Sequence, residues 1–128
     1  MRIMNIKDAN KLKAYVGGYT GSSYELVIDF ENKKAEYKAF DYGYTPAGKY
    51  SIDISEDNLE QLLQDLYEVK LLQWEKTYAD PGILDGTSWS VKVYFKSGSF
   101  ESSGTNAYPK KWGQFCDSLE RLTGHTFR

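Results

Sequence analysis

This 128-residue chain contains very little histidine or cysteine, the side chains that most often act as a general base, a nucleophile or a zinc ligand. The chain contains one histidine, His125, close to the C-terminus, where side chains are usually solvated. It also contains one cysteine, Cys116, on the apolar side of an expected helix, where a thiol behaves as a small hydrophobic group. Together they are too few for an ordinary zinc site. No Gly-x-Ser-x-Gly elbow, phosphate loop or dinucleotide fingerprint is present. We therefore expect no catalytic residue, no metal and no cofactor.

Two further features could serve a ligand. Asp80 and Asp85 flank a short segment, and paired carboxylates can hydrolyse glycosides or bind a metal. Residues 103–109, SGTNAYP, could hold an anion at the start of the helix that follows. However, Asp before Pro or Gly is typical of turns, and Gly104 and Asn106 are residue types that supply unusual backbone angles. We favour a structural role for both features.

The strongest local charge bias lies between residues 53 and 68, which contain six acidic and no basic residues. On a helix over this segment, Asp57, Asp65 and Glu68 fall opposite a leucine stripe. Such a face is usually only solvated, but it can also attract a basic protein partner. Because tyrosine is enriched at interfaces, we predict a partner-binding surface that joins these acids to Tyr42 and Tyr44.

Apolar residues at alternate positions predict the strands of a sheet. The clearest is residues 87–96, in which Trp89, Val91, Val93 and Phe95 share one face. A turn is predicted at residues 45–48. The other strands are predicted at residues 12–19, 23–30, 35–44, 49–54, 70–78 and 100–103.

Two amphipathic segments predict helices. The first is capped by Ser55 and runs to about residue 69. The second opens at Pro109 and stops at Gly124. The order of elements predicts an α+β fold, with an antiparallel sheet of about five to seven strands and both helices packed on one face.

The composition is that of a single globular domain over residues 1–128. The net charge is −2 and no basic block is present, which argues against nucleic-acid binding as the main activity. No apolar run approaches the ~20 residues of a membrane span, and the first residues lack the apolar core of a signal peptide. With one cysteine, no internal disulfide can form. These features predict a cytoplasmic protein.

Aromatic and glycine residues in the second half form a spaced pattern. It reads W-x-x-x-Y from Trp74, D-G-x-x-W from Asp85, and S-x-G-x-N-x-Y-P ending at Pro109. In this pattern the chain resembles a group of small uncharacterised bacterial α+β proteins. The resemblance covers about residues 70–124 and implies a bacterial or phage source and one α+β domain. It assigns no catalytic residue.

Three classes of function remain open. We favour a non-enzymatic protein-binding inhibitor, such as an immunity protein against a bacterial toxin or a phage inhibitor of a host defence nuclease. The small size, the many tyrosines and the acidic segment favour this class. The alternatives are a small-ligand-binding domain and an accessory module, the latter forming a homodimer through an exposed sheet edge. Fold alone does not decide among them.

Overall fold

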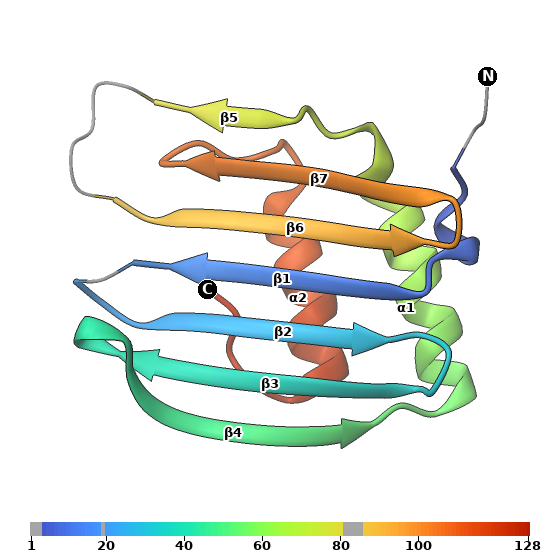
Figure 1. Cartoon of the computed structure of the whole chain (residues 1–128), viewed down its shortest axis with the longest axis horizontal. Helices are drawn as coiled ribbons and strands as arrows, with labels where there is room; N and C mark the ends of the chain where they lie inside the picture. Colours follow the sequence, from blue (N-terminus) through green and yellow to red (C-terminus); the bar gives the residue numbers. More distant parts are fainter. Residues whose placement is uncertain (1–3, 19, 81–85) are drawn as a thin grey trace.

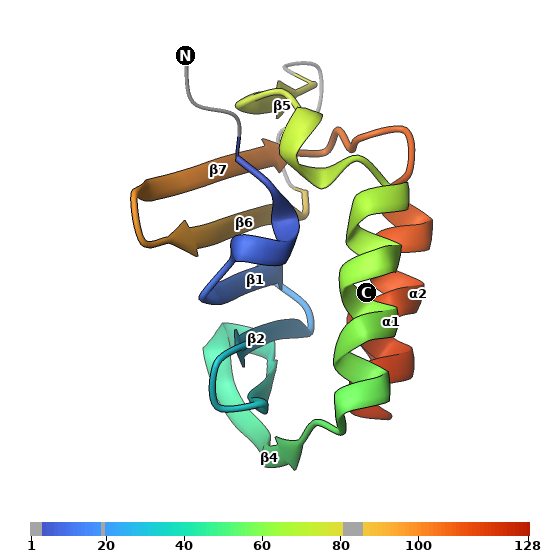
Figure 2. The same ribbon diagram turned by 90° about the vertical axis from the view of Figure 1, so that its right-hand side faces the viewer.

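The computed structural model describes residues 4–18, 20–80 and 86–128, and in this part of the chain it contains one seven-stranded sheet. Two α-helices lie behind the sheet in Figure 1, and the edge-on view in Figure 2 places both on the same face. This is the α+β arrangement predicted from the sequence. The strands are β1 (Lys11–Gly17), β2 (Ser23–Asp29), β3 (Lys34–Asp41), β4 (Thr45–Asp53), β5 (Thr77–Ala79), β6 (Ser88–Phe95) and β7 (Gly98–Thr105), and the helices are α1 (Glu56–Glu68) and α2 (Trp112–Thr123).

The strands lie in the spatial order β4-β3-β2-β1-β6-β7-β5. Neighbouring strands are antiparallel, as predicted, except that β5 runs parallel to β7. The two edges differ, because β5 has three residues and β4 has nine. The sheet therefore ends on one side in a long strand.

The core lies between the sheet and the two helices. Trp89, Val91, Val93 and Phe95 are buried on the helix-facing side of β6, which confirms their predicted orientation. Alternate residues of the neighbouring strands point to the same side, because side chains of a strand alternate between faces. The helices contribute buried side chains from one face each: Leu59, Leu62, Leu66, Phe115, Cys116 and Leu119.

The helix boundaries are predicted well at three of four ends. Ser55 caps α1, since its Oγ accepts a hydrogen bond from the backbone N–H of Asn58 at 3.1 Å. Gly124 ends α2 with a φ of 75°. The predicted start at Pro109 is wrong, because residues 109–111 form a separate turn closed by the Trp112 N–H and the Pro109 carbonyl. Within the described residues no helix is long and apolar enough to cross a membrane.

The predicted turn at residues 45–48 is also wrong. The chain reverses in a short 3-10 turn, η2 (Tyr42–Tyr44), where Gly43 and Tyr44 have φ of 71° and 58°. β4 then begins at Thr45 and includes Pro46. Proline lacks the backbone donor, but an edge strand tolerates it near its start.

The predicted strand at residues 70–78 is mostly absent. Lys70 has a φ of 55° and leads into a 3-10 turn, η3 (Leu71–Gln73), with β5 only at its end. Leu71 and Trp74 are both buried, and they lie three residues apart, the spacing of a helical turn. The alternation of side chains in this segment therefore does not correspond to which of them are buried. A further 3-10 turn, η1 (Ile6–Asp8), precedes β1.

Candidate functional site

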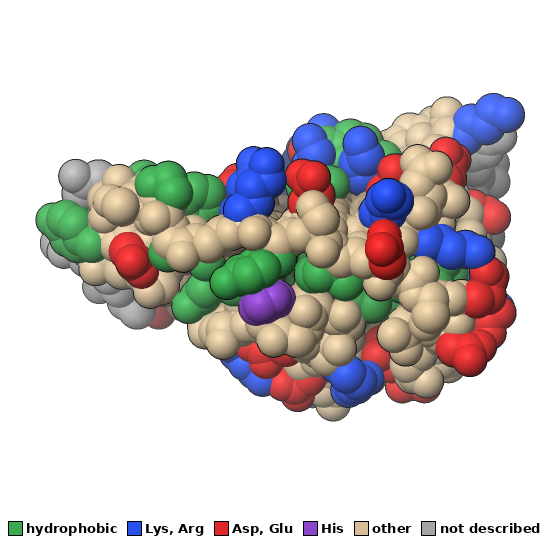
Figure 3. Space-filling view, turned by 90° about the horizontal axis from the view of Figure 1, so that it is seen from below, with side chains coloured by type: hydrophobic (Ala, Val, Ile, Leu, Met, Phe, Trp, Pro, Cys, Tyr) green, Lys and Arg blue, Asp and Glu red, His purple; other side chains and the backbone are tan. Residues whose placement is uncertain are grey.

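The sheet face that the helices leave uncovered carries rows of polar side chains. Figure 3 views the β4 edge with this open face upward, and Lys, Asp and Glu side chains gather along its upper surface. Strand pairing places the side chains in three rows that cross the sheet from β4 toward β7. The rows are Lys49, Lys38, Glu25, Tyr15, Ser90 and Ser103; Ser51, Glu36, Val27, Lys13, Lys92 and Glu101; and Asp53, Lys34, Asp29, Lys11, Tyr94 and Ser99.

A groove of about 580 Å³ lies over the centre of this face, and we call it the open-face groove. It extends from β3 across β2, β1, β6 and β7 to β5. Its polar lining mixes both signs of charge on a floor of strand backbone. The outward-pointing side chains are Lys13, Tyr15, Glu25, Val27, Glu36, Lys38, Ser90, Lys92, Glu101 and Ser103, with Lys76 and Thr77 from the β5 edge.

Two lysines face each other at the middle of the groove. Lys13 on β1 is directly opposite Lys92 on β6, and their Nζ atoms lie 5.6 and 5.0 Å from the centre of the Tyr94 ring. Lys92 Nζ is also 3.3 Å from Glu101, and the hydrogen bond with Glu101 raises the pKa of Lys92. Like charges directly opposite destabilise a sheet, and such local conflicts are typical of functional surfaces.

Tyrosines mark one end of the groove. Burial, followed by a side-chain hydrogen bond with Tyr44, raises the pKa of Tyr15 to about 12. Tyr15 lines the groove, so this contact joins the groove to the turn between β3 and β4. In that turn Tyr42 and Tyr44 are 63% and 48% exposed. The open-face groove therefore continues into a projecting aromatic surface.

The acids predicted to bind a partner lie on α1, in the other layer of the fold. Asp57 and Glu68 are exposed. Asp65 instead turns toward α2, where Arg121 Nη1 lies 3.0 Å from its carboxylate and Gln61 donates a hydrogen bond to it at 2.9 Å. Its side chain is only 13% exposed, so its predicted position on the outer face is wrong.

The five predicted partner-binding residues do not form one surface within a single chain. Tyr42 and Tyr44 precede β4, whereas α1 follows it, and Figure 1 shows these segments at opposite ends of that strand. Nine residues of β4 separate them, which corresponds to roughly 30 Å of extended chain. The aromatic half lies beside the open-face groove, and the acidic half does not.

The C-terminal segment packs against the sheet instead of fraying, so the expectation of a solvated His125 is wrong. The His125 ring stacks on Tyr37 and Tyr50, with ring centres 4.9 and 4.2 Å away. The Tyr37 hydroxyl donates a hydrogen bond to the Thr126 carbonyl at 2.6 Å. Phe127 is 1% exposed and inserts into the core.

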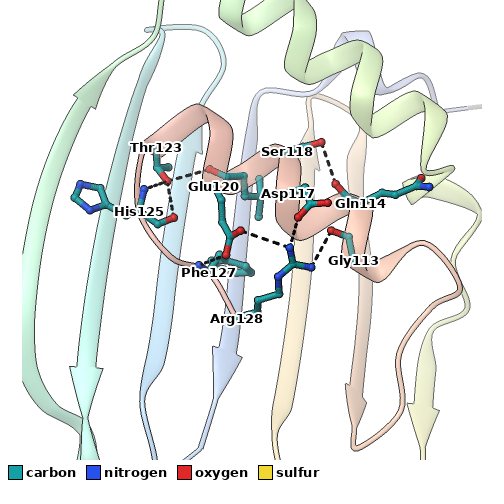
Figure 4. A network of polar contacts seen from close by, with 10 residues as sticks. Gly113, Gln114, Asp117, Ser118, Glu120, Thr123, His125, Phe127 and Arg128 are labelled. Carbon is teal, nitrogen blue, oxygen red and sulfur yellow. Dashed lines mark hydrogen bonds and ion pairs between the residues drawn. The ribbon is translucent and has the colours of Figure 1, made fainter.

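Polar contacts hold the same segment to α2, as Figure 4 shows. Arg128 forms ion pairs with Asp117 and Glu120 and donates to the Gly113 carbonyl at 3.1 Å. The backbone N–H of Phe127 donates to Glu120 at 2.9 Å. These contacts and the Phe127 ring tie the end of the chain to α2.

A smaller hollow of about 300 Å³ lies beside His125 on the helix side of the sheet. Tyr24, Tyr37 and Tyr50 line it. Tyr37 on β3 lies directly opposite Tyr50 on β4, and Tyr24 on β2 is diagonal to Tyr37 because it pairs with Ala39. Their rings and the His125 ring are close to parallel, with angles of 18° to 37° between contacting pairs. The arrangement is a stack of aromatic rings and not a cage around a central space.

The spaced pattern in the second half of the chain builds structure. Trp89 Nε1 donates to the Ala107 carbonyl at 2.8 Å. Asn106 adopts a φ of 55°, as expected, and its Oδ1 accepts a hydrogen bond from the Thr87 N–H at 3.1 Å. Gly104 does not have a positive φ. It is required instead because a Cβ there would lie 2.5 Å from Trp89 Nε1.

The first part of the pattern has a similar role. Trp74 Nε1 donates to the Val69 carbonyl at 3.0 Å. The Tyr78 hydroxyl accepts a hydrogen bond from the Glu75 N–H at 2.9 Å, and Ser102 Oγ donates to the Glu75 carbonyl at 2.6 Å. These bonds attach the segment after α1 to β7, where β5 completes the sheet.

The other candidate reactive residues have equally clear positions. Cys116 is fully buried, and burial raises its pKa to about 12, so the thiolate that a nucleophile requires is disfavoured. Asp85 lies outside the described residues, so its pairing with Asp80 is not described. Among residues 4–18, 20–80 and 86–128, no three His, Cys, Asp or Glu side chains are grouped to hold a metal ion.

No protein-family model and no curated protein matches this sequence. The open-face groove is therefore identified from the geometry of the structure alone. Its residues were not predicted as a site from the sequence. The available signal was a repeated Lys-x-Tyr on the polar side of two strands, Lys13 and Tyr15 on β1 and Lys92 and Tyr94 on β6. This signal does not enter the sequence-based prediction, because nothing in the sequence states that β1 and β6 are neighbours.

Proposed function

We propose that the chain is a non-enzymatic protein-binding inhibitor that docks its target on the open-face groove and the adjoining Tyr42–Tyr44 turn. The observation that carries this proposal is the groove itself, which has a volume of about 580 Å³ and is lined by charges of both signs on the uncovered sheet face. The groove continues into the exposed side chains of Tyr42 and Tyr44. An immunity protein for a bacterial toxin and a phage inhibitor of a host defence nuclease are the two forms of inhibitor that we favour.

The character of the lining supports a protein target over a small molecule. Pockets for small ligands are lined mainly by hydrophobic and aromatic side chains with a few polar groups. The open-face groove carries many more charges than such a pocket, with four lysines and three glutamates among its lining residues. Charges of both signs on a broad surface select a complementary partner and guide its approach.

Tyr42 and Tyr44 supply the anchors in this proposal. Binding energy at protein interfaces concentrates on few residues, among which tyrosine is enriched. Asp57 and Glu68 contribute only long-range attraction to a basic target, because they lie on α1, in the layer of the fold behind the sheet. Asp65 takes no part, since Arg121 already pairs with it.

The experiment uses the purified protein as bait in extracts of the cell that encodes it. Beside the wild type, it uses the double variant Tyr42→Ala/Tyr44→Ala. The matched control is Tyr67→Ala, which removes a tyrosine of similar exposure from α1, away from the groove. We expect the wild type and Tyr67→Ala to retain the same protein, and the double variant to retain at least tenfold less.

The captured protein is then purified and its activity is measured with increasing amounts of this chain. Loss of activity at equimolar addition supports inhibition. A partner whose activity does not change contradicts the inhibitor role, and equal capture by the double variant contradicts the proposed surface.

A second candidate function, small-ligand binding, is favoured by the hollow beside His125. Its volume of about 300 Å³ is at the lower limit for ligand pockets, and tyrosines line it. A fragment screen by NMR would test this candidate, with Tyr50→Ala as the control variant. Ligands that shift resonances around Tyr24, Tyr37 and His125, and that Tyr50→Ala no longer binds, would support it.

A further inference from the structure

The outer edge of β4 presents unused backbone groups. The Ile54 N–H donates to the Lys33 carbonyl at 2.8 Å, so this pair is hydrogen bonded across β3 and β4. Hydrogen-bonded and non-bonded pairs alternate along an antiparallel ladder. The N–H and C=O groups of Lys49, Ser51 and Asp53 therefore point away from β3. In the described part of the chain, no strand pairs with this side of β4.

Protection of this edge is uneven. Proteins guard exposed edges with proline, bulges, short strands and lysines. Pro46 and the bulge beside it, where Ala47 is left out between the Phe40–Pro46 and Ala39–Gly48 pairs, protect only the first part of β4. From Gly48 to Asp53 the strand pairs regularly with β3, and Lys49 is the one guarding feature in that stretch. A second strand has room to pair there.

We propose that two copies of this chain pair antiparallel through β4, with Ser51 of each copy opposite Ser51 of the other. The outward N–H and C=O groups of Lys49, Ser51 and Asp53 then form the hydrogen-bonded positions of the new ladder. The two sheets join into one continuous sheet, in which the β4 edge of each copy is covered.

Charge complementarity selects this register. The row of Lys11, Asp29, Lys34 and Asp53 alternates in sign across the open face and ends at the β4 edge on an acid. In the proposed register the next residue in that row is Lys49 of the second copy. The two-fold symmetry forms this pair twice, as an isologous interface requires.

Lys49 has a residue of like charge beside it on β3. The residue directly opposite it is Lys38, so two like charges stand side by side on β3 and β4. Like charges in this position destabilise a strand pair. Asp53 of the second copy supplies the opposite charge on the free side, so Lys49 acts as a contact and not as a guard.

The helix-facing side of the pair is also complementary. Tyr50 is 47% exposed although its ring stacks on His125. In the proposed register it lies opposite Ile52 of the second copy, in a position without ladder hydrogen bonds, where side chains approach most closely. Aromatic and β-branched residues form favourable cross-strand pairs.

The dimer changes the surface available to a target. Antiparallel pairing about an axis perpendicular to the sheet leaves both open faces on the same side. It also brings the Tyr42–Tyr44 turn of one copy to the end of the shared strand pair where α1 of the other copy begins. Asp57, which is near the start of α1, then lies at the same end of the assembly as the aromatic turn of the other copy.

The test is sedimentation of the purified chain over a range of concentrations, with variants that address the register. Lys49→Asp and Asp53→Lys each place like charges together across the two-fold axis, and the double variant exchanges the charges. We expect the wild type to sediment with twice the monomer mass and each single variant to dimerise at least tenfold more weakly. The double variant should regain the wild-type affinity, and Lys110→Asp, an equal charge change elsewhere, should have no effect.

A fifth variant addresses the backbone pairing independently of charge. Ser51→Pro removes an outward N–H but keeps the bonds between β3 and β4, so it should fold and remain monomeric. Circular dichroism of each variant confirms its fold. A wild type that is monomeric up to millimolar concentration overturns the proposal, as does a dimer that survives Ser51→Pro or that the charge exchange does not restore. The measurement uses the chain alone, so its outcome is separate from the inhibitor proposal.

Discussion

The indole nitrogen of Trp89 on β6 donates a hydrogen bond to the carbonyl oxygen of Ala107, 2.8 Å away in the loop before α2. Gly104 on β7 lies directly against this bond. A Cβ on Gly104 would be 2.5 Å from Trp89 Nε1 and 2.7 Å from the Ala107 oxygen. The loop that leads to α2 is therefore held to the core through a tryptophan that only a glycine neighbour can accommodate.

Gly104→Ala should destabilise the protein strongly. The added methyl group meets an indole and a backbone carbonyl that are both held in place, so β7 or the loop must shift. We expect the free energy of unfolding to fall by ~2–3 kcal/mol, the upper range for overpacking a core. Urea denaturation monitored by tryptophan fluorescence measures the change.

Gly21→Ala is the matched control for this substitution. A Cβ at Gly21 has no neighbouring atom within 4 Å, and its φ does not require glycine. We expect a change within ~0.5 kcal/mol, as for other surface substitutions. Equal effects at Gly21 and Gly104 would contradict the role assigned to the contact with Trp89.

Phe127, the residue of the core nearest the C-terminus, should also contribute to stability. Phe127→Ala empties a site that is 1% exposed, and we expect a loss of ~3–5 kcal/mol. Tyr37→Phe removes only the hydrogen bond to the Thr126 carbonyl and should cost ~1 kcal/mol. Thermal denaturation of both variants tests whether Phe127→Ala is the more destabilising of the two. A frayed C-terminus would make both changes negligible.

Much of the fold could be predicted because local signals and packing agree. The alternation of Trp89, Val91, Val93 and Phe95 directly indicates a strand with one buried face. Ser55 and Gly124 mark helix ends by bonds and angles that involve only nearby residues. Such features depend on interactions between residues close in the sequence, so they can be predicted without knowing the tertiary structure.

The errors arise where distant contacts decide. Leu71 begins a 3-10 turn and Trp74 follows it, and both side chains reach the core, although the surrounding residues alternate like a strand. Asp65 faces Arg121, which is 56 residues away, so its helix position alone gave the wrong side. The groove has the same origin, since Lys13 and Lys92 meet only because β1 and β6 pair.

Cys116 should react with thiol reagents only after unfolding. Burial raises its pKa from 9.0 to about 12, so the native thiol stays protonated at neutral pH. The unfolded thiol ionises at lower pH than the native one, so the native state loses stability as pH rises from about 9 toward 12. Labelling with a maleimide at pH 7.5, with and without urea, measures the accessibility.

Cys116→Ala tests the pH dependence separately. It removes the titrating thiol, so its free energy of unfolding should decline less than that of the wild type between pH 8.5 and 10.5. The comparison uses slopes, because the smaller side chain also lowers stability at every pH. Fast labelling of the native protein, or identical slopes, would contradict the buried thiol.

The final prediction concerns Lys13 and Lys92, which face each other in the open-face groove. Lys13→Glu replaces a like-charge pair with an opposite-charge pair across β1 and β6, so we expect stability to rise by ~0.5 kcal/mol. Lys11→Glu is the same substitution two residues away, but there it faces Asp29, so stability should fall by a similar amount. Urea denaturation at low salt measures both, and 1 M salt should reduce both differences. If the groove binds the target, the more stable Lys13→Glu variant should capture less of it. A variant that gains stability and keeps full capture would remove Lys13 from the proposed interface.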